Sequence, residues 1–281
     1  MELTVLGSGG CMPIPRPLCN CGICREAREK GHPFRRTGPS LFIHGDNLLI
    51  DTPAEIGTQL NREGICSLSH ILFTHLDPDH IEGLRVIEQI ALDFRTWRGI
   101  PEKRLTLLIP RALMEHFGEI TTVYGPWLDF LEDSGFAVCR EFDSTIRLGE
   151  LKITAIRVPG SNPPVFIFVF EKQGARIVYA PCDIKPFPES RQQVRHPDLL
   201  LIQPGMFEQG LAGDFRYPEG HVSRTTLYTY DDTLALAERL KADRVVFIHL
   251  EEYWHRSFSD YMAMETDNIT FAYDGMPLAI P

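Results

Sequence analysis

Residues 71–83 read ILFTHLDPDHIEG and gather four metal-binding side chains within six residues, namely His75, Asp77, Asp79 and His80. The apolar residues before them are typical of a buried strand, and side chains two apart in an extended chain point the same way, so His75 and Asp77 can share one target. Apolar residues at helical spacing indicate a helix from Asp79 onward. Because imidazole and carboxylate donors together suit zinc, manganese or iron, the stretch predicts a metal site and not merely a capped helix.

The pattern HLDPDH at residues 75–80 resembles the HxHxDH signature of the metallo-β-lactamase superfamily. One position differs from the signature, because Asp77 stands where the signature has its second His. The resemblance implies an α/β fold, the four-layer αβ/βα sandwich, over nearly the whole chain. We expect residues 1–281 to form a single domain, since no Ser/Gly-rich or Pro-rich linker divides them.

The composition is typical of a soluble globular protein, with 43% hydrophobic and 23% charged residues. The longest apolar run is too short to span a bilayer, so we expect no contact with a membrane. Residues 1–10 lack the features of a signal peptide, which favours a cytoplasmic location. A formal net charge of -10 argues against an extended nucleic-acid footprint. The sequence does not fix the oligomeric state, and a homodimer is compatible with it.

Three of the seven cysteines form a short hook, CxCxxC, at Cys19, Cys21 and Cys24. Without an export signal a disulfide framework is not expected, and three thiols so close together predict one structural zinc. The hook resembles one branch of the superfamily, the phosphodiesterases similar to the phosphoribosyl cyclic phosphodiesterase of phosphonate breakdown. In that branch the fourth ligand is a His close behind the last active-site His. His255 is therefore the expected ligand, but it lies further from His249 than the resemblance implies, so Glu252 and a water stay open as alternatives.

The superfamily resemblance also assigns a set of catalytic metal ligands. One complete site consists of Asp79, His80, His249 and a bridging Asp183. A second site consists of His75, Asp77 and the same Asp183. That second site lacks one His, because Gly160 follows Val158-Pro159 where many relatives carry it. We therefore expect one or two catalytic divalent metals, namely manganese, zinc or iron, with Asp77 favouring the harder ions.

Three further roles follow from the resemblance. Asp51 supports the metal-binding loop from behind, although a helix cap is equally compatible with its position. Asp79 accepts the proton of the attacking water. His221 resembles a His that contacts the substrate phosphate, so it is expected to bind phosphoryl oxygens or to protonate the leaving group.

Residues 93–135 combine a strand with two helical stretches, and we expect them to form a helical insertion that covers the site. From Phe136 onward, apolar residues alternate with polar ones. This pattern predicts a meander of antiparallel strands, the second half of the sandwich, at residues 136–140, 144–148, 151–158, 164–170 and 175–180.

Together these features predict a metal-dependent hydrolase, and specifically a phosphodiesterase acting on a small phosphate ester, cyclic esters included. Two alternatives belong to other classes. One is an iron-dependent oxygenase similar to the pyrroloquinoline quinone biosynthesis protein B, which has a cysteine hook and an altered metal motif. The other is a non-catalytic binding protein whose metal site has decayed through Asp77 and Gly160.

Overall fold

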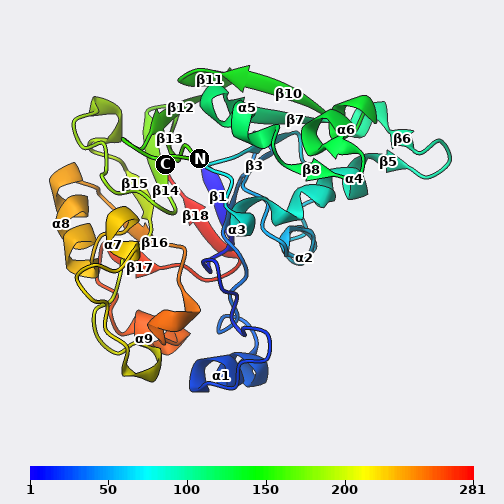
Figure 1. Cartoon of the computed structure of the whole chain (residues 1–281). Coiled ribbons are helices and arrows are strands. Elements are labelled where there is room, and N and C mark those ends of the chain that lie inside the picture. Colours follow the sequence, from blue (N-terminus) through cyan, green and yellow to red (C-terminus); the bar gives the residue numbers. More distant parts are fainter.

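Two seven-stranded β-sheets lie face to face in the computed structural model, which describes residues 1–281 (Figure 1). Helices cover the outer faces of both sheets, so the chain has four layers. This arrangement confirms the αβ/βα sandwich that the motif at residues 75–80 predicts.

The first sheet combines parallel and antiparallel pairs. Its strand order is β10 (Ala137–Phe142), β7 (Leu105–Pro110), β4 (His70–Leu72), β3 (Leu48–Ile50), β2 (Ser40–Ile43), β1 (Glu2–Gly7) and β18 (Met276–Ala279). The four strands from β10 to β3 run parallel, and the pairs from β3 to β18 are antiparallel. Parallel neighbours require crossover connections, and the short helices between these strands provide them.

The second sheet begins as the predicted meander and ends with parallel strands. Its order is β11 (Thr145–Leu148), β12 (Leu151–Arg157), β13 (Phe166–Lys172), β14 (Ala175–Ala180), β15 (Leu199–Ile202), β16 (Val245–Phe247) and β17 (Ile269–Phe271). One prediction is wrong here: the strand expected at residues 136–140 is β10, which pairs in parallel with β7 in the first sheet. Alternation shows that one face of a strand is buried, but it does not identify the neighbouring strand.

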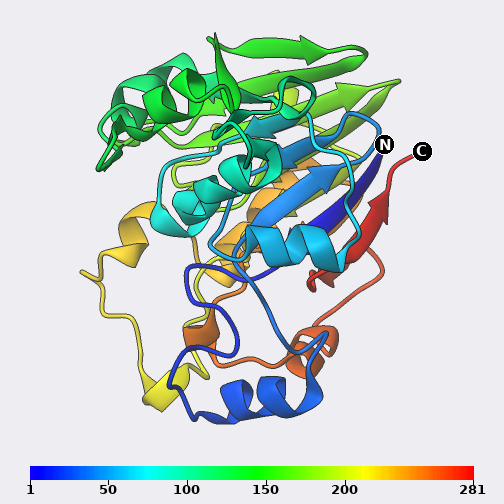
Figure 2. The same ribbon diagram turned by 90° about the vertical axis from the view of Figure 1, so that its right-hand side faces the viewer.

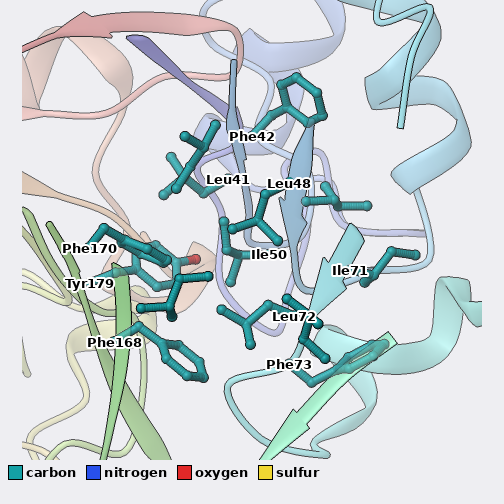
Figure 3. Packing of buried hydrophobic residues seen from close by; sticks show 14 of the residues in the cluster. Leu41, Phe42, Leu48, Ile50, Ile71, Leu72, Phe73, Phe168, Phe170 and Tyr179 are labelled. Carbon is teal, nitrogen blue, oxygen red and sulfur yellow. The ribbon is translucent and has the colours of Figure 1, made fainter. Parts of the chain in front are cut away.

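The main core of 48 buried residues lies between the sheets and under the helices of the first sheet. Figure 3 shows Phe170 and Tyr179 of the second sheet facing Leu41 and Ile50 of the first. A second cluster of 26 buried residues fills the space between the outer face of the second sheet and its helices. The second sheet is therefore covered on both faces, which explains the continuous apolar run at residues 165–170.

The helices are short. They are α1 (Gly22–Lys30), α2 (Ile56–Arg62), α3 (Pro78–Ile81), α4 (Val86–Ala91), α5 (Arg111–Phe117), α6 (Trp127–Asp133), α7 (Ser223–Thr226), α8 (Tyr230–Leu240) and α9 (Phe258–Met262). None of them combines the length and the apolar character that crossing a membrane requires. Figures 1 and 2 show α1 apart from the sheets, at the same end of the molecule as α9.

Residues 93–135 differ from the helical insertion expected from the sequence. They include β7, a strand of the first sheet, and α5 and α6 contact β7 and β10 at the edge of that sheet. Two small hairpins, β5 (Leu92–Asp93) with β6 (Arg98–Gly99) and β8 (Thr121–Thr122) with β9 (Gly125–Pro126), complete the segment. None of its residues lines the cavity beside His75 described below, so the segment does not cover that cavity.

Candidate metal centre

Three buried histidines face one another at the carboxyl ends of the strands. His75 and His80 follow β4, His249 follows β16, and none is more than 2% exposed. The Nε2 atoms of His80 and His249 are 3.4 Å apart, and the ring centroids of His75 and His80 are 4.0 Å apart. Asp79 Oδ2 lies 3.3 Å from His249 Nε2 and 3.5 Å from His80 Nε2. We call these four residues the candidate metal centre.

The opposite side of each ring is held by an oxygen of the protein. The Nδ1 contacts are 2.8 Å to Asp51 Oδ2 for His80, 2.9 Å to Thr74 Oγ1 for His75 and 3.3 Å to Glu251 Oε1 for His249. A ring whose Nδ1 carries the proton has a free lone pair on Nε2. His75 and His80 therefore present Nε2 as an acceptor. At His249, Gln203 Nε2 also lies 3.3 Å from Nδ1.

The donor set fits a metal ion. His75 Nε2 and Asp79 Oδ2 are both buried and form no well-oriented hydrogen bond. Leaving such atoms unpaired away from water is costly, and a divalent cation can satisfy lone pairs of nitrogen and oxygen together. His75, Asp79, His80 and His249 could therefore hold a metal.

The electrostatics around His80 also favour a cation. Burial lowers the pKa of His80, but the charge and hydrogen bond of Asp51, a hydrogen bond with Cys182 and the charge of Asp79 raise it to about 10 overall. Groups that stabilise a proton on a buried ring also stabilise a metal cation beside it.

Asp51 supports His80 and does not cap the following helix. It has no exposed surface, and its carboxylate accepts hydrogen bonds from Thr74 N at 2.8 Å and Thr74 Oγ1 at 2.7 Å besides its contact with His80. The N-cap residue of α2 is Glu55. Of the two roles compatible with the sequence, the geometry favours support of the metal-binding loop.

Cys182 lies among the histidines, and Asp183 does not. Cys182 Sγ and one nitrogen each of His75 and His80 all lie within 4.8 Å of one another. Asp183 belongs to no such group and lines a neighbouring cavity. The backbone at Asp183 is left-handed, with a φ of 49°. This placement departs from the bridging role predicted for Asp183, and a cysteine directly before it is the signal that sequence reasoning missed.

Asp77 lies at the rim of the candidate metal centre. Its Oδ2 is 3.7 Å from His75 Nε2, and its side chain is 53% exposed. Burial raises the pKa of Asp77, and the charges of Asp183 and Asp79 raise it further. Asp77 is therefore near enough to reach a metal beside His75, but it is closer to solvent than Asp79.

A cavity of about 350 Å³ opens beside His75 and Asp77. Gly160, at the corner where many relatives carry His, also lines it, and a Cβ atom there would meet nothing within 4 Å. The place of the missing imidazole is therefore open space. The remaining lining is mixed. Four prolines, Leu76 and Val165 are apolar, and the polar side chains are Ser161, Asn162, Asp183, Lys185, Thr225 and Thr226.

His221 lines a different cavity, of about 380 Å³, together with Phe215, Tyr217 and Tyr253. Its ring centroid is 4.9 Å from that of Tyr217, and its Nδ1 accepts a hydrogen bond from Ser223 N at 3.2 Å. The structure therefore does not place His221 in the cavity that contains His75.

The cysteine hook meets Glu252. Its Oε1 lies 3.5 Å from Cys19 Sγ, 3.4 Å from Cys21 Sγ and 3.5 Å from Cys24 Sγ. Cys24 and Glu252 are buried, whereas His255 is exposed. Of the three candidates for a fourth ligand, the structure brings Glu252 to the hook. The four residues could hold a second, separate metal, since the group shares no residue with the histidines.

Glu251 is a residue of the site that sequence reasoning missed. Besides its contact with His249, its Oε1 accepts a hydrogen bond from Cys11 N at 3.1 Å. A Cβ atom on Gly10 would overlap the Glu251 carboxylate and the His249 ring. The glycine turn after β1 is thus required by close packing against the candidate metal centre.

Sequence comparison identifies a family. Residues 46–250 match the model of the Beta-lactamase superfamily domain. Among curated proteins, an octanoyltransferase of Porphyromonas gingivalis is 38% identical over 94 residues, which make up 32% of this chain and 18% of that protein. The chain thus spans about a fifth of the length of that relative.

Solved structures share the fold. A diphosphatase from the PhnP family has 24% identity and a TM-score of 0.75, over 100% of this chain and 98% of its own. Zn²⁺-bound PqqB from Methylobacterium extorquens has 18% identity and a TM-score of 0.75, over 100% of both chains. Human tRNase Z, short form, has 16% identity and a TM-score of 0.64, again over 100% of both chains. The family match over most of the sequence, together with this fold, shows that the chain belongs to the metallo-β-lactamase superfamily.

Proposed function

We propose that the protein is a metal-dependent phosphodiesterase that acts on a small phosphate ester. The observation that carries this proposal is the cavity beside His75 and Asp77, which is lined by a single lysine, Lys185, and by several hydroxyl groups. A cavity of about 350 Å³ suits a small molecule. Its hydroxyl groups and its cation suit the oxygens of a phosphate.

The ammonium group of Lys185 has hydrogen-bond donors available for a ligand. Its Nζ donates one hydrogen bond to the carbonyl oxygen of Arg224, at 3.0 Å. An ammonium group has three donors, so two remain for a ligand. Asp77 and Asp183 line the same cavity and would repel an anion. Phosphate binding therefore requires both Lys185 and a metal cation to offset the two carboxylates.

A divalent ion held by the candidate metal centre would lower the pKa of a bound water and polarise a phosphoryl oxygen. Burial raises the pKa of Asp79, but contacts with His249 and His80 hold it well below its usual range, so Asp79 is ionised. We assign the proton of the attacking water to Asp79 Oδ1, because Oδ2 contacts the two rings. Asp51 keeps the Nδ1 proton on His80 and so leaves its Nε2 free.

His221 enters the proposal as a contact for the leaving group. Ser223 in its cavity and Thr225 in the cavity of Lys185 both belong to α7, so the two cavities flank one short helix. We place the ester phosphate in the cavity of Lys185. We propose that one of its alcohol groups extends past α7 toward His221.

A panel of phosphodiesters, offered to protein reconstituted with manganese, zinc or iron, tests the activity. In Lys185→Met the KM for an anionic diester should rise about 10- to 100-fold with little change in kcat, because a hydrogen bond to a charged group contributes roughly 1.5–3 kcal/mol. Inhibition by inorganic phosphate should weaken in parallel. Lys103→Met, at an exposed lysine of residues 93–135, should behave as wild type.

Two results would count against this function. If no phosphodiester is hydrolysed with any of the three metals, the phosphodiesterase proposal fails, and oxygen uptake by the iron form would favour the oxygenase instead. If KM is unchanged in Lys185→Met while the diester is turned over, the phosphate is bound elsewhere.

For the cysteine hook we propose zinc, because thiolates with one carboxylate form a donor set that zinc accepts. Cys21→Ser should lose one zinc equivalent and unfold at a lower temperature, since metal binding contributes to folding free energy and each kcal/mol shifts Tm by roughly 2–4 °C in a large domain. Glu252→Gln should weaken zinc retention against a chelator. His255→Ala, the matched control, should retain it. Full zinc content in Cys21→Ser would remove the hook as a metal site.

A further inference from the structure

Cys182 reaches the candidate metal centre by the same route as His249. It lies two residues beyond the end of β14, and β14, β15 and β16 run parallel, so the carboxyl ends of β14 and β16 lie at one edge of the second sheet. At that edge Cys182 Sγ and one nitrogen each of His75 and His80 lie within 4.8 Å of one another. The fold therefore presents a thiol to two imidazoles of the first sheet.

An independent observation points into the same space. His75 is only 2% exposed, and its Nε2 is buried without a hydrogen-bond partner. Its Nδ1 already contacts Thr74 Oγ1, so Nε2 is the side left for a ligand. A buried, unpaired nitrogen next to a thiol is an arrangement that a metal ion would complete.

Asp183 does not share this arrangement. It belongs to no group of converging metal-ligating atoms, and it forms no hydrogen bond or ion pair with any of the three histidines.

We propose that Cys182, and not Asp183, binds the metal as a thiolate beside His75 and His80. On binding, the thiol gives its proton to solvent and its sulfur lone pair to the metal, so no oxidant or reductant is needed. The centre then offers three imidazoles, the Asp79 carboxylate and one thiolate. A soft thiolate favours zinc over manganese or magnesium, which opposes the preference that Asp77 alone would give.

Cobalt substitution gives a direct readout. A thiolate bound to Co²⁺ produces a charge-transfer band in the near ultraviolet, and the cysteine hook contributes its own band equally in every variant. Relative to wild type, Cys182→Ser should lose part of this band and bind metal at the candidate metal centre ~10-fold or more weakly. Cys182→Asp should lose the same part of the band but keep most of the affinity, because a carboxylate replaces the thiolate. Asp183→Asn and the exposed-site control Cys66→Ser should keep the wild-type band.

Alkylation gives a second readout that needs no folding-sensitive variant. Wild-type protein is treated with iodoacetamide in the presence of a chelator or after loading with zinc, and the modified peptides are mapped by mass spectrometry. Zinc should protect Cys182 severalfold at the candidate metal centre. Exposed Cys66 should be modified equally in both samples.

The opposite pattern would overturn the proposal. An unchanged cobalt band in Cys182→Ser, together with equal alkylation of Cys182 with and without zinc, would show that the thiol does not bind. Loss of metal from Asp183→Asn but not from Cys182→Ser would show that Asp183, and not Cys182, is the metal ligand. None of these outcomes depends on the substrate, so they are separate from a failure of the phosphodiesterase proposal.

Discussion

His249→Ala is expected to remove the metal from the candidate metal centre and to abolish turnover, while the zinc of the cysteine hook stays in place. The imidazole is 1% exposed, so alanine leaves a buried cavity and removes a donor that lies 3.4 Å from His80 Nε2. It also leaves the carboxylates of Asp79 and Glu251 without their contacts to this ring. Groups that merely orient a ligand are worth 10- to 100-fold in metal affinity or activity, so loss of the ligand itself should exceed ~100-fold in both.

Elemental analysis and a chelator-competition titration measure this effect. His249→Ala should retain one zinc equivalent, and His116→Ala, a control on α5, should retain the full wild-type content. A thermal melt of the zinc-loaded protein separates loss of metal from loss of fold. Full metal content and rate in His249→Ala would mean that the three histidines do not form a metal site.

Asp51→Asn should weaken metal binding about 10- to 100-fold although Asp51 touches no substrate cavity. Asparagine has the same shape and tolerates the positive φ of 62° at this position. Its amide group, however, replaces one acceptor oxygen by a donor. Asp51 accepts hydrogen bonds from Thr74 N, Thr74 Oγ1 and His80 Nδ1, so one of these contacts must be lost. If His80 responds by moving its proton to Nε2, that proton occupies the lone pair the metal needs.

The affinity of Asp51→Asn is measured by competition with a chelator, with Asp143→Asn as the control, because Asp143 is 77% exposed on the surface. Thermal stability should fall as well, since a buried donor left unpaired costs about 1–3 kcal/mol. Wild-type metal affinity in Asp51→Asn would show that Asp51 only packs against the loop.

The sequence predicts those residues of the site that lie close together along the chain. His75, Asp79 and His80 lie within one strand-to-helix junction, so spacing alone indicates that they converge. Cys182 and Asp183 are different, because they are adjacent in a loop after β14, and apolar periodicity does not encode which of the two faces the histidines. Sequence reasoning chose the carboxylate, and the geometry favours the thiol.

Contacts between distant segments were also beyond prediction. Glu251 and the glycine turn after β1 are about 240 residues apart, and only the finished sandwich brings them together. The pairing of β10 with β7 is a similar case, since a partly exposed edge strand carries little information about its partner. Fold class follows from the motif and the alternation, whereas the neighbours of each strand follow from packing.

Glu251 and Glu252 are consecutive residues that serve different groups. Glu251 contacts His249, and Glu252 contacts the three thiols of the cysteine hook. One peptide unit therefore separates the residue that contacts the candidate metal centre from the residue that contacts the hook. Any effect of an ion in the hook on metal affinity at the centre must be reciprocal: whatever factor the first ion adds to the affinity for the second, the second adds to the affinity for the first.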